Sequence, residues 1–337
     1  MSHQKHIVLL STGGTIASAP GEDGRDVSGA LPGEQLAEQV RLPAHLRLEV
    51  RSILQKPSNA INADDLAHMA RCCRELIDQG EVDGIVITHG TDTLEDTAYY
   101  LDCVLDSPRV PVVVTGAQRV PHALGSDAYA NLANAVHVAA AEVCRDLGVL
   151  VAFNQSVFAA AFVRKVSSFQ LNGFDAPGLG ALGVVDNGQV HLLQQPLRQP
   201  GLPADAPLAR VDVLPAMLGA DAACVAAALA SGPAGVVIDG LGRGHVPPDW
   251  MPALAAARAA GVVVAVTSST LHGPTHESYQ FPGSLHDLAR IGAIAVSHLS
   301  ARKARIRLGL LLGAGITEPQ RVQAHFDWQR VRCQSSN

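Results

Sequence analysis

The 337-residue chain has few aromatic residues, little net charge and no long apolar run. Phe, Trp and Tyr make up 4% of the residues, so aliphatic side chains must form most of any core. The formal charge is −6, and no basic run with interleaved aromatic residues occurs, which argues against a nucleic-acid-binding protein. No stretch reaches the roughly 20 apolar residues that span a bilayer, and the run at 6–11 is too short for a signal peptide. These absences predict a cytoplasmic protein that contacts neither nucleic acid nor membrane.

The six cysteines form no C-x-x-C pair and have no spacing typical of a metal finger. Most of them lie in apolar, helix-like segments, so we expect buried free thiols. The stretch "LHGPTHE" (271–277) loosely resembles a set of metal ligands, but Gly273 and Pro274 prevent the helical turn that an H-E-x-x-H site requires. We therefore predict that the chain binds no metal.

Eight short aliphatic runs of strand length recur along the chain, and several are apolar at nearly every position. Continuous rather than alternating hydrophobicity is typical of strands that are buried on both faces of a parallel sheet. Helix-like segments lie between the runs, so the pattern predicts right-handed βαβ crossovers. The predicted strands are residues 6–11, 48–54, 84–90, 110–116, 148–154, 235–240, 261–268 and 291–297.

Two helices and one hairpin have clear local signals. Residues 63–80 and 126–148 have apolar positions at helical spacing, an Asp near the start and a Gly at the end. Residues 183–193 place an Asn-Gly step between two Val-rich runs, which is a strong hairpin signal. A segment rich in Pro, Gln and Ala follows directly and is typical of a linker. The chain is longer than one compact core usually holds, so we predict two domains.

The predicted fold is α/β, with a larger N-terminal catalytic domain over residues 1–193, a linker over 194–208 and a smaller C-terminal α/β domain over 209–337. The larger domain is expected to contain a mostly parallel, flavodoxin-like sheet flanked by helices. In open sheets of this kind, ligands bind at the carboxyl ends of the strands. The residues that directly follow each aliphatic run are therefore the candidates for chemistry.

The stretch "STGGTIAS" (11–18) follows the first run and does not match a phosphate-binding loop. It lacks the G-x-G-x-x-G spacing, and no Gly-Lys-Ser/Thr follows it. Gly13 and Gly14 allow a sharp turn from which Thr15 can project its hydroxyl. Taken alone, the stretch favours an ordinary turn whose threonines cap backbone groups.

The stretch "THGTDT" (88–93) follows the third run and is dense in hydroxyl groups. Thr91 offers a hydroxyl for nucleophilic attack or proton transfer, and Asp92 offers a carboxylate for a cationic amine. The alternative is a helix N-cap, because acidic residues follow in the first turn. Lys165 lies in a mostly apolar stretch, where a desolvated lysine can act as the base for a threonine hydroxyl. Taken alone, a surface lysine beside Arg164 is the simpler interpretation.

Together, "TGGTIAS" and "ITHGTDTLEDTAYYLD" resemble the two signatures of the bacterial-type L-asparaginase family, amidohydrolases with two active-site threonines. The similarity extends to "VVVTGAQR", "SDAYANLANAV", "GLGRGH" and "LSARKARIRLGLLL", and it covers nearly the whole chain. The resemblance implies hydrolysis of the side-chain amide of L-asparagine to L-aspartate and ammonia, often with some action on L-glutamine. It also implies that no cofactor is needed, and a homotetramer of tight dimers in which a neighbouring subunit completes each site.

The resemblance also implies roles for individual residues. Thr15 matches the first threonine, which is often assigned as the nucleophile. Thr91 and Lys165, with Asp92, match a second cluster that activates water or, in some proposals, supplies the nucleophile. Ser58 and Asp92 match residues that hold the α-carboxylate and α-amino groups of the substrate. The other predicted substrate contacts are Asn59, Gly90 and the backbone of Ala117.

Three departures from the family pattern bear on substrate choice and on the lid. The loop after the first signature contains no Tyr, and the matching position falls near Asp26 or Val27. Asn59 stands where Gln or Glu is common, and Arg243 and His245 replace an Asn that often reaches into the partner's site. The alternatives to an L-asparaginase are therefore a glutaminase-asparaginase, an amidase for a larger amide, or a non-catalytic amino-acid sensor.

Overall fold

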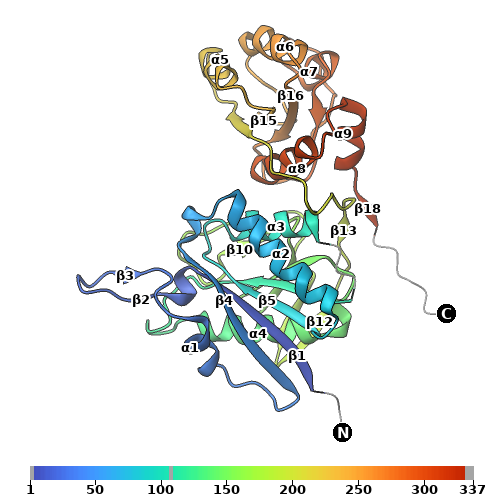
Figure 1. Ribbon diagram of the computed structural model, residues 1–337. Helices are drawn as coiled ribbons and strands as arrows, with labels where there is room; N and C mark the ends of the chain where they lie inside the picture. The colour runs from blue at the N-terminus through green and yellow to red at the C-terminus, as the bar shows by residue number, and fades with distance from the viewer. Residues whose placement is uncertain (1–3, 106–108, 331–337) are drawn as a thin grey trace, which may run out of the picture. The chain divides into compact units, whose positions relative to one another are not determined.

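The structure is a computed structural model that describes residues 4–105 and 109–330 (Figure 1). Residues 1–3 and 331–337, the outermost parts of the two predicted domains, lie outside the described residues. The described chain divides into two compact units. Unit 1 is the chain up to Arg198 together with Arg330, and unit 2 is Gln199–Gln329.

Unit 1 is built around an eight-stranded sheet with the strand order β12-β11-β8-β7-β6-β5-β1-β4. The neighbours β4-β1-β5-β6-β7 are parallel, and β8, β11 and β12 continue the sheet in antiparallel fashion. This parallel order is the flavodoxin-like one, so the predicted fold class is confirmed. The bounds are β1 Lys5–Gly13, β4 Leu46–Lys56, β5 Gly84–Thr88, β6 Val112–Thr115, β7 Val149–Phe153, β8 Ser156–Ala159, β11 Gly183–Asp186 and β12 Gln189–Leu192.

The central strands of this sheet are buried on both faces. Residues 7–10 of β1 and 112–114 of β6 are fully inaccessible to solvent. Leu9 and Val113 belong to one hydrophobic cluster with the inner face of α4, while the residues on either side of them point to the opposite face. This two-sided burial is why the runs are apolar at nearly every position.

Helices cover both faces of the sheet in unit 1 (Figure 1). Their bounds are α1 Gly33–Glu38, α2 Ala63–Gln79, α3 Leu94–Val104 and α4 Ala128–Ala140. α2 begins with a capping box between Asn62 and Asp65 and ends at Gly80 in the left-handed conformation, so both its predicted ends are close to the observed ones. The predicted helix 126–148 is too long, because Ala141 is extended and a separate 3₁₀ turn, η3 Glu142–Cys144, follows it.

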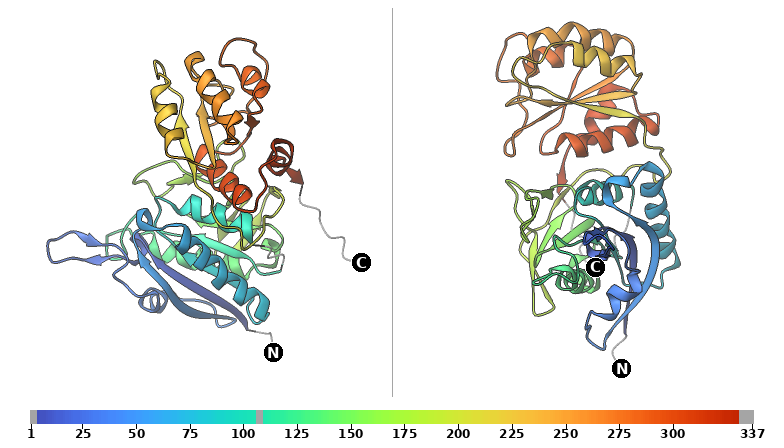
Figure 2. Two further views of the ribbon diagram at one scale, coloured as in Figure 1. Left: turned by 45° about the horizontal axis from the view of Figure 1, so that its top comes forward. Right: turned by 90° about the vertical axis from the view of Figure 1, so that its left-hand side faces the viewer.

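One crossover departs from the predicted right-handed geometry. α3 connects β5 to β6 and α4 connects β6 to β7, so two right-handed crossovers would place both helices on one face. α4 and α1 pack on one face, whereas α3 lies with α2 on the other (Figures 1 and 2). The β6–α4–β7 crossover therefore has the opposite hand. The buried carboxylate of Asp127, just before α4, accepts hydrogen bonds from the backbone N–H groups of Gln118 and Arg119, which holds the chain after β6 to this face.

Unit 2 is built around a parallel sheet in the sequential order β14-β15-β16-β17. α5, α6 and α7 share one hydrophobic core on one face, and α8 covers the other (Figure 2). β17 is shorter than the predicted strand 291–297, and the side-chain amide of Gln323 binds both backbone groups of Ala295 (3.2 and 3.1 Å). The bounds are β14 Val211–Pro215, β15 Gly235–Gly240, β16 Val263–Ser268, β17 Ile294–Ala295, α5 Ala223–Ala230, α6 Met251–Ala259, α7 Leu285–Arg290, α8 Ala301–Gly313 and α9 Pro319–Phe326.

Short elements complete the described chain. The predicted hairpin is present as β11 and β12, and its turn residues Asn187 and Gly188 have φ angles of 47° and 74°. Within residues 4–105 and 109–330, no helix is long and apolar enough to cross a membrane. The short elements are β2 Ala19–Pro20, β3 Asp26–Val27, β9 Arg164–Lys165, β10 Phe174–Asp175, β13 Leu197–Arg198, β18 Gln329–Arg330, η1 Thr15–Ala17, η2 Ser58–Ala60 and η4 Pro248–Trp250.

The cysteines that the structure describes are free thiols, most of them buried as predicted. Burial raises the pKa of the Cys144 thiol to about 12, so this thiol is unreactive at neutral pH. The buried cysteines are Cys73, Cys103 and Cys144, while Cys72 is half-buried, Cys224 is exposed and Cys333 lies outside the described residues.

Candidate active site

Four strand ends of unit 1 lie next to one another at one edge of the sheet. β4, β1, β5 and β6 are successive parallel neighbours, and the residues that follow them include Ser58, Thr15, Thr91 and Ala117, respectively. The strand order reverses at β1, and the gap between the loops after β1 and β5 is where open α/β sheets bind ligands. All the predicted site residues belong to unit 1.

The turns after β1 and β5 touch through their glycines. A Cβ on Gly14 would lie 2.3 Å from the backbone N of Gly90, and Gly14 has a φ of 82°. A Cβ on Gly90 would lie 2.7 Å from the Cβ of Ser58. A side chain at either position would push these segments apart, because the backbone of Gly90 blocks the space beside Gly14, and the Ser58 side chain and the Gly14 Cα block the space beside Gly90. The two glycines therefore bring Thr15, Thr91 and Ser58 into one site.

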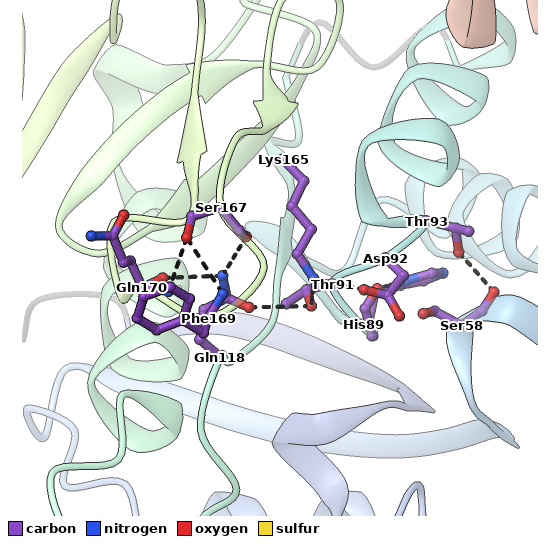
Figure 3. Close-up of polar contacts among 11 residues, drawn as sticks. Ser58, His89, Thr91, Asp92, Thr93, Gln118, Lys165, Ser167, Phe169 and Gln170 are labelled. Atoms are coloured by element: carbon purple, nitrogen blue, oxygen red, sulfur yellow. Dashed lines mark hydrogen bonds and ion pairs between the residues drawn. The ribbon is translucent and has the colours of Figure 1, made fainter.

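Lys165 reaches Thr91 and Asp92 from the other side of the site (Figure 3). Its Nζ donates to Thr91 Oγ1 at 2.7 Å and to Asp92 Oδ1 at 2.6 Å. The side chain of Lys165 is 16% exposed, so the surface-lysine interpretation is wrong. β9 pairs with β10, where the ring of Phe174 packs on that of Phe153 at 4.7 Å, and this contact anchors the backbone of Lys165.

The two predicted substrate contacts after β4 differ in their surroundings. Ser58 is buried, whereas Asn59 beside it is exposed. Thr93 Oγ1 donates to the carbonyl oxygen of Ser58 at 2.8 Å. Thr93 occupies the N-cap position of α3, but its side chain caps no helix N–H. Thr93 is therefore no side-chain cap, and it uses its hydroxyl to connect two strand ends, while the acidic residues expected in the first turn of the helix are present.

Thr15 begins the short helix η1 and is partly buried. No hydrogen bond joins its hydroxyl to another residue that the structure describes. The chain then forms the β2–β3 hairpin, where Asp26 Oδ1 lies 3.1 Å from Nε2 of His122 in the β6–α4 loop. A carboxylate–imidazole contact thus occupies one of the two positions at which the resemblance placed the missing tyrosine.

Two family models together match nearly all of the chain. The model described as "Asparaginase, N-terminal" matches residues 6–198, and the model described as "Glutaminase/Asparaginase C-terminal domain" matches residues 210–326. The chain belongs to the asparaginase family. The resemblance stated from the two threonine signatures is therefore confirmed.

Individual members of the asparaginase family are similar over most of their length. An L-asparaginase of Bacillus licheniformis is 39% identical over 92% of this chain and 96% of that protein. A glutaminase-asparaginase of Pseudomonas fluorescens biotype A is 34% identical over 77% of this chain and 74% of that protein. The crystal structure of a probable cytoplasmic L-asparaginase from Campylobacter jejuni has a TM-score of 0.86 and 27% identity, and the match covers 96% of this chain and 99% of that chain.

His89 belongs to the asparaginase signature "THGTDT", but sequence reasoning gave it no role. Its ring is fully buried, with Nδ1 donating to the carbonyl oxygen of Gly90 at 2.8 Å and Nε2 lying 3.0 Å from Thr97 Oγ1. Burial lowers the pKa of His89, so the ring is neutral at pH 7 and Nε2 accepts from Thr97. The neutral ring fixes the peptide between Gly90 and Thr91. The signal in the sequence was a lone histidine inside a hydroxyl-rich strand end.

Gln118 is a second residue of this candidate site for which the sequence indicated no role. Thr91 Oγ1 donates to Gln118 Oε1 at 3.4 Å (Figure 3). Gln118 Nε2 donates to the carbonyl oxygens of Ser167 and Gln170 at 3.1 and 3.0 Å. Gln118 closely follows the predicted strand 110–116, but Ser167 is 49 residues further along the chain, a contact that the sequence does not reveal.

The two residues for which the resemblance implied a replaced asparagine belong to unit 2, after β15. Arg243 Nη1 donates to Ser278 Oγ at 3.1 Å. His245 Nδ1 accepts from the backbone N–H of Leu285, and its ring packs edge-on against Phe281 at 5.0 Å. Among the described residues, no three His, Cys, Asp or Glu side chains are grouped so that they could hold a metal ion.

Proposed function

We propose that this chain is an L-asparaginase, which hydrolyses the side-chain amide of L-asparagine to L-aspartate and ammonia. The observation that carries the proposal is the cluster of Lys165, Thr91 and Asp92, which shares the β1/β5 strand end with Thr15. Amide hydrolysis needs an activated hydroxyl, a group that transfers protons, and donors for the developing oxyanion. The cluster supplies the first two, and the glycine turns leave backbone N–H groups for the third. The 39% identity to an L-asparaginase supports the same substrate.

We assign the nucleophile to Thr15. Its hydroxyl has no hydrogen-bond partner among the described residues, whereas the Thr91 hydroxyl accepts from Lys165 and donates to Gln118. Thr15 Oγ1 attacks the amide carbon, and the proton it loses passes to the amide nitrogen, which leaves as ammonia when the C–N bond breaks. Water then cleaves the acyl ester, which releases L-aspartate and restores the hydroxyl. Thr91 and Lys165 transfer the protons in both steps.

The remaining predicted residues bind the α-amino acid part of the substrate. The Asp92 side chain is 72% exposed, and its carboxylate attracts the α-ammonium group. Ser58 presents its hydroxyl and backbone N–H to the α-carboxylate, and Asn59 lies at the amine. The backbone groups of Gly90 and Ala117 line the amide end. A second candidate substrate is L-glutamine, which the short, exposed Asn59 and the 34% identity to a glutaminase-asparaginase favour.

We further propose a cytoplasmic homotetramer of tight dimers, with the sites at the dimer interface. The family resemblance supports the assembly, and the similarity to a probable cytoplasmic L-asparaginase supports the location. Light scattering of the purified protein tests the assembly. A mass of about four chains of 35.1 kDa is expected, and a monomer would contradict it.

Ammonia release from L-asparagine, measured between about pH 6 and 9, tests the proposed activity. L-glutamine assayed in parallel gives the ratio of the two kcat/KM values and decides between the candidate substrates. Lys165→Met is expected to lower kcat by about a hundredfold or more, since it removes the proton-transfer partner of Thr91. Lys56→Met is a matched control, because Lys56 makes a similar ion pair with Asp65 at 2.8 Å outside the cluster. Binding of L-aspartate without any ammonia release would instead support the sensor alternative.

A further inference from the structure

The side-chain amide of Gln118 is held in one of its two possible orientations. Its Nε2 donates to the carbonyl oxygens of Ser167 and Gln170 at 3.1 and 3.0 Å, which uses both amide hydrogens. A flipped amide would place its own oxygen against these two carbonyl oxygens, where no hydrogen is available. Oε1 is therefore directed to Thr91, whose hydroxyl lies 3.4 Å away.

The two hydrogen-bond partners of Thr91 fix the direction of its hydroxyl hydrogen. A hydroxyl has one hydrogen, and the Thr91 oxygen already accepts from Lys165 Nζ at 2.7 Å. The hydrogen of Thr91 must therefore point to a different acceptor, and Gln118 Oε1 is in that position. We infer that Gln118 is a positioning residue: it holds the Thr91 hydroxyl with a lone pair toward Lys165 and its hydrogen away from it. This inference rests on the proposed function, because it concerns the same proton-transfer cluster.

The fold holds Gln118 in place from three sides. Both carboxylate oxygens of Asp127 accept from its backbone N–H, at 3.1 and 3.0 Å. A Cβ at Gly173 would lie 2.0 Å from Nε2, so only glycine leaves room for the amide. Ser167 Oγ accepts from the backbone N–H of Gln170 at 3.1 Å, which folds the turn that presents the two carbonyl groups. The amide thus ties the β6–α4 loop to the turn after β9 (Figure 3).

Gln118 acts on Thr91, whereas the groups proposed to bind the substrate's α-amino acid part are Ser58 and Asp92. Without the Gln118 acceptor, the Thr91 hydroxyl is free to turn and its side chain to leave Lys165. Proton transfer then starts from a poorer geometry, which slows turnover. Because Ser58 and Asp92 keep their positions, the loss is expected in kcat and not in KM.

The variant Gln118→Met tests this role, because it removes both ends of the amide and keeps the length of the side chain. Gln194→Met is the matched control: Gln194 Nε2 also donates to two backbone carbonyl oxygens, those of Leu179 and Ala181, both at 2.9 Å. Both variants lose two hydrogen bonds of the same kind. With L-asparagine, Gln118→Met is expected to lower kcat about tenfold, the rate equivalent of one net hydrogen bond, and to leave KM within about twofold. Gln194→Met is expected to leave both constants within about twofold.

Two results would overturn the inference while the proposed function stands. The first is an equal fall of kcat in Gln118→Met and Gln194→Met, and the second is an effect of Gln118→Met on KM alone. Crystal structures of both variants give a readout that needs no turnover: Thr91 Oγ1 is expected to move away from Lys165 only in Gln118→Met. If the wild-type chain releases no ammonia, the proposed function fails by itself. The position of Thr91 in the Gln118→Met structure then decides the inference, and an unmoved side chain overturns it.

Discussion

Unit 1 and unit 2 are both parallel α/β sheets, yet the predicted site residues all lie in unit 1. In unit 1 the parallel order β4-β1-β5-β6-β7 reverses at β1, so the loops after β1 and β5 depart to different sides and leave a space between them. In unit 2 the order follows the sequence from β14 to β17, and no such reversal occurs. Glycine-rich turns follow strands in both units. The predicted site residues therefore coincide with the reversal of strand order and not with glycine turns in general.

The two units also differ in the handedness of their βαβ crossovers. In unit 2 the helices after β14, β15 and β16 share one face, as right-handed crossovers require. In unit 1 the β6–α4–β7 crossover has the opposite hand, and the chain after β6 is fastened by Asp127. Gln118, in the same loop, lies within hydrogen-bond distance of Thr91. The uncommon hand therefore occurs next to the candidate site.

The largest expected difference in activity between the two units comes from removing strand-end hydroxyls from each. Thr15→Ala and Thr91→Ala are expected to lower kcat for L-asparagine by about a thousandfold or more, because one removes the nucleophile and the other the proton-transfer group. Ser268→Ala, at the end of β16 in unit 2, is expected to change kcat by less than about twofold. Ammonia release measures all three.

Either of two outcomes would contradict the roles assigned to these hydroxyl groups. Near-full activity of Thr15→Ala would move the nucleophile to Thr91, whose hydroxyl is already bonded to Lys165. A large loss in Ser268→Ala would show that a strand end of unit 2 takes part in turnover. Far-ultraviolet circular dichroism of each variant separates these results from loss of folding.

The sequence was sufficient for features that are local or periodic. Apolar runs predicted the central strands, an Asp near the start and a Gly at the end predicted α2 close to its observed bounds, and Asn187-Gly188 formed the predicted hairpin. The threonine signatures predicted the family. Capping failed at Thr93, because its hydroxyl has a partner 35 residues away, the carbonyl oxygen of Ser58. Tertiary contacts of this kind leave no periodic signal in a single chain.

The parts of the site that residue patterns alone do not reveal are those defined by what they touch. The family resemblance predicted Lys165, whereas its own stretch favoured a surface lysine, because its proximity to Thr91 depends on the pairing of β9 with β10. His89 and Gln118 hold the peptide and the hydroxyl of Thr91, and neither contact follows from spacing. The hand of the β6–α4–β7 crossover also escaped prediction, since the general rule favours the other one.

A smaller effect is expected from adding a methyl group to one glycine in each unit. Gly14→Ala places a Cβ 2.3 Å from the backbone of Gly90 at a φ of 82°, so it combines overlap with backbone strain. We expect it to lower the free energy of unfolding by roughly 3 kcal/mol and to reduce activity, since the turns separate. At Gly242 φ is 50°, and a substitution to Ala would place the new Cβ more than 4 Å from any non-neighbouring atom. Gly242→Ala is therefore expected to lower the free energy of unfolding by only about 1 kcal/mol.

Urea unfolding of both glycine variants, with ammonia release as a second readout, sharpens the difference between the turns. Similar losses of stability would mean that backbone strain alone sets the cost. The close contact between Gly14 and Gly90 would then not be what joins the two threonines. Full activity in a Gly14→Ala protein that is also destabilised would lead to the same conclusion by a separate route.

The smallest expected effect concerns protons on the buried histidines of the two units. Burial lowers the pKa of both His89 and His245, and His89 is the more deeply buried. The unfolded chain takes up a proton near pH 6.5, while the folded ring stays neutral, so the free energy of unfolding falls as the pH drops below that value. The change per histidine is at most about 1.4 kcal/mol per pH unit. NMR titration of the ring protons should find His89 uncharged at a pH where His245 is already partly charged. If His89 took up its proton first, a charged ring would donate the hydrogen bond to Gly90. The conclusion that a neutral His89 ring fixes the peptide between Gly90 and Thr91 would then be wrong.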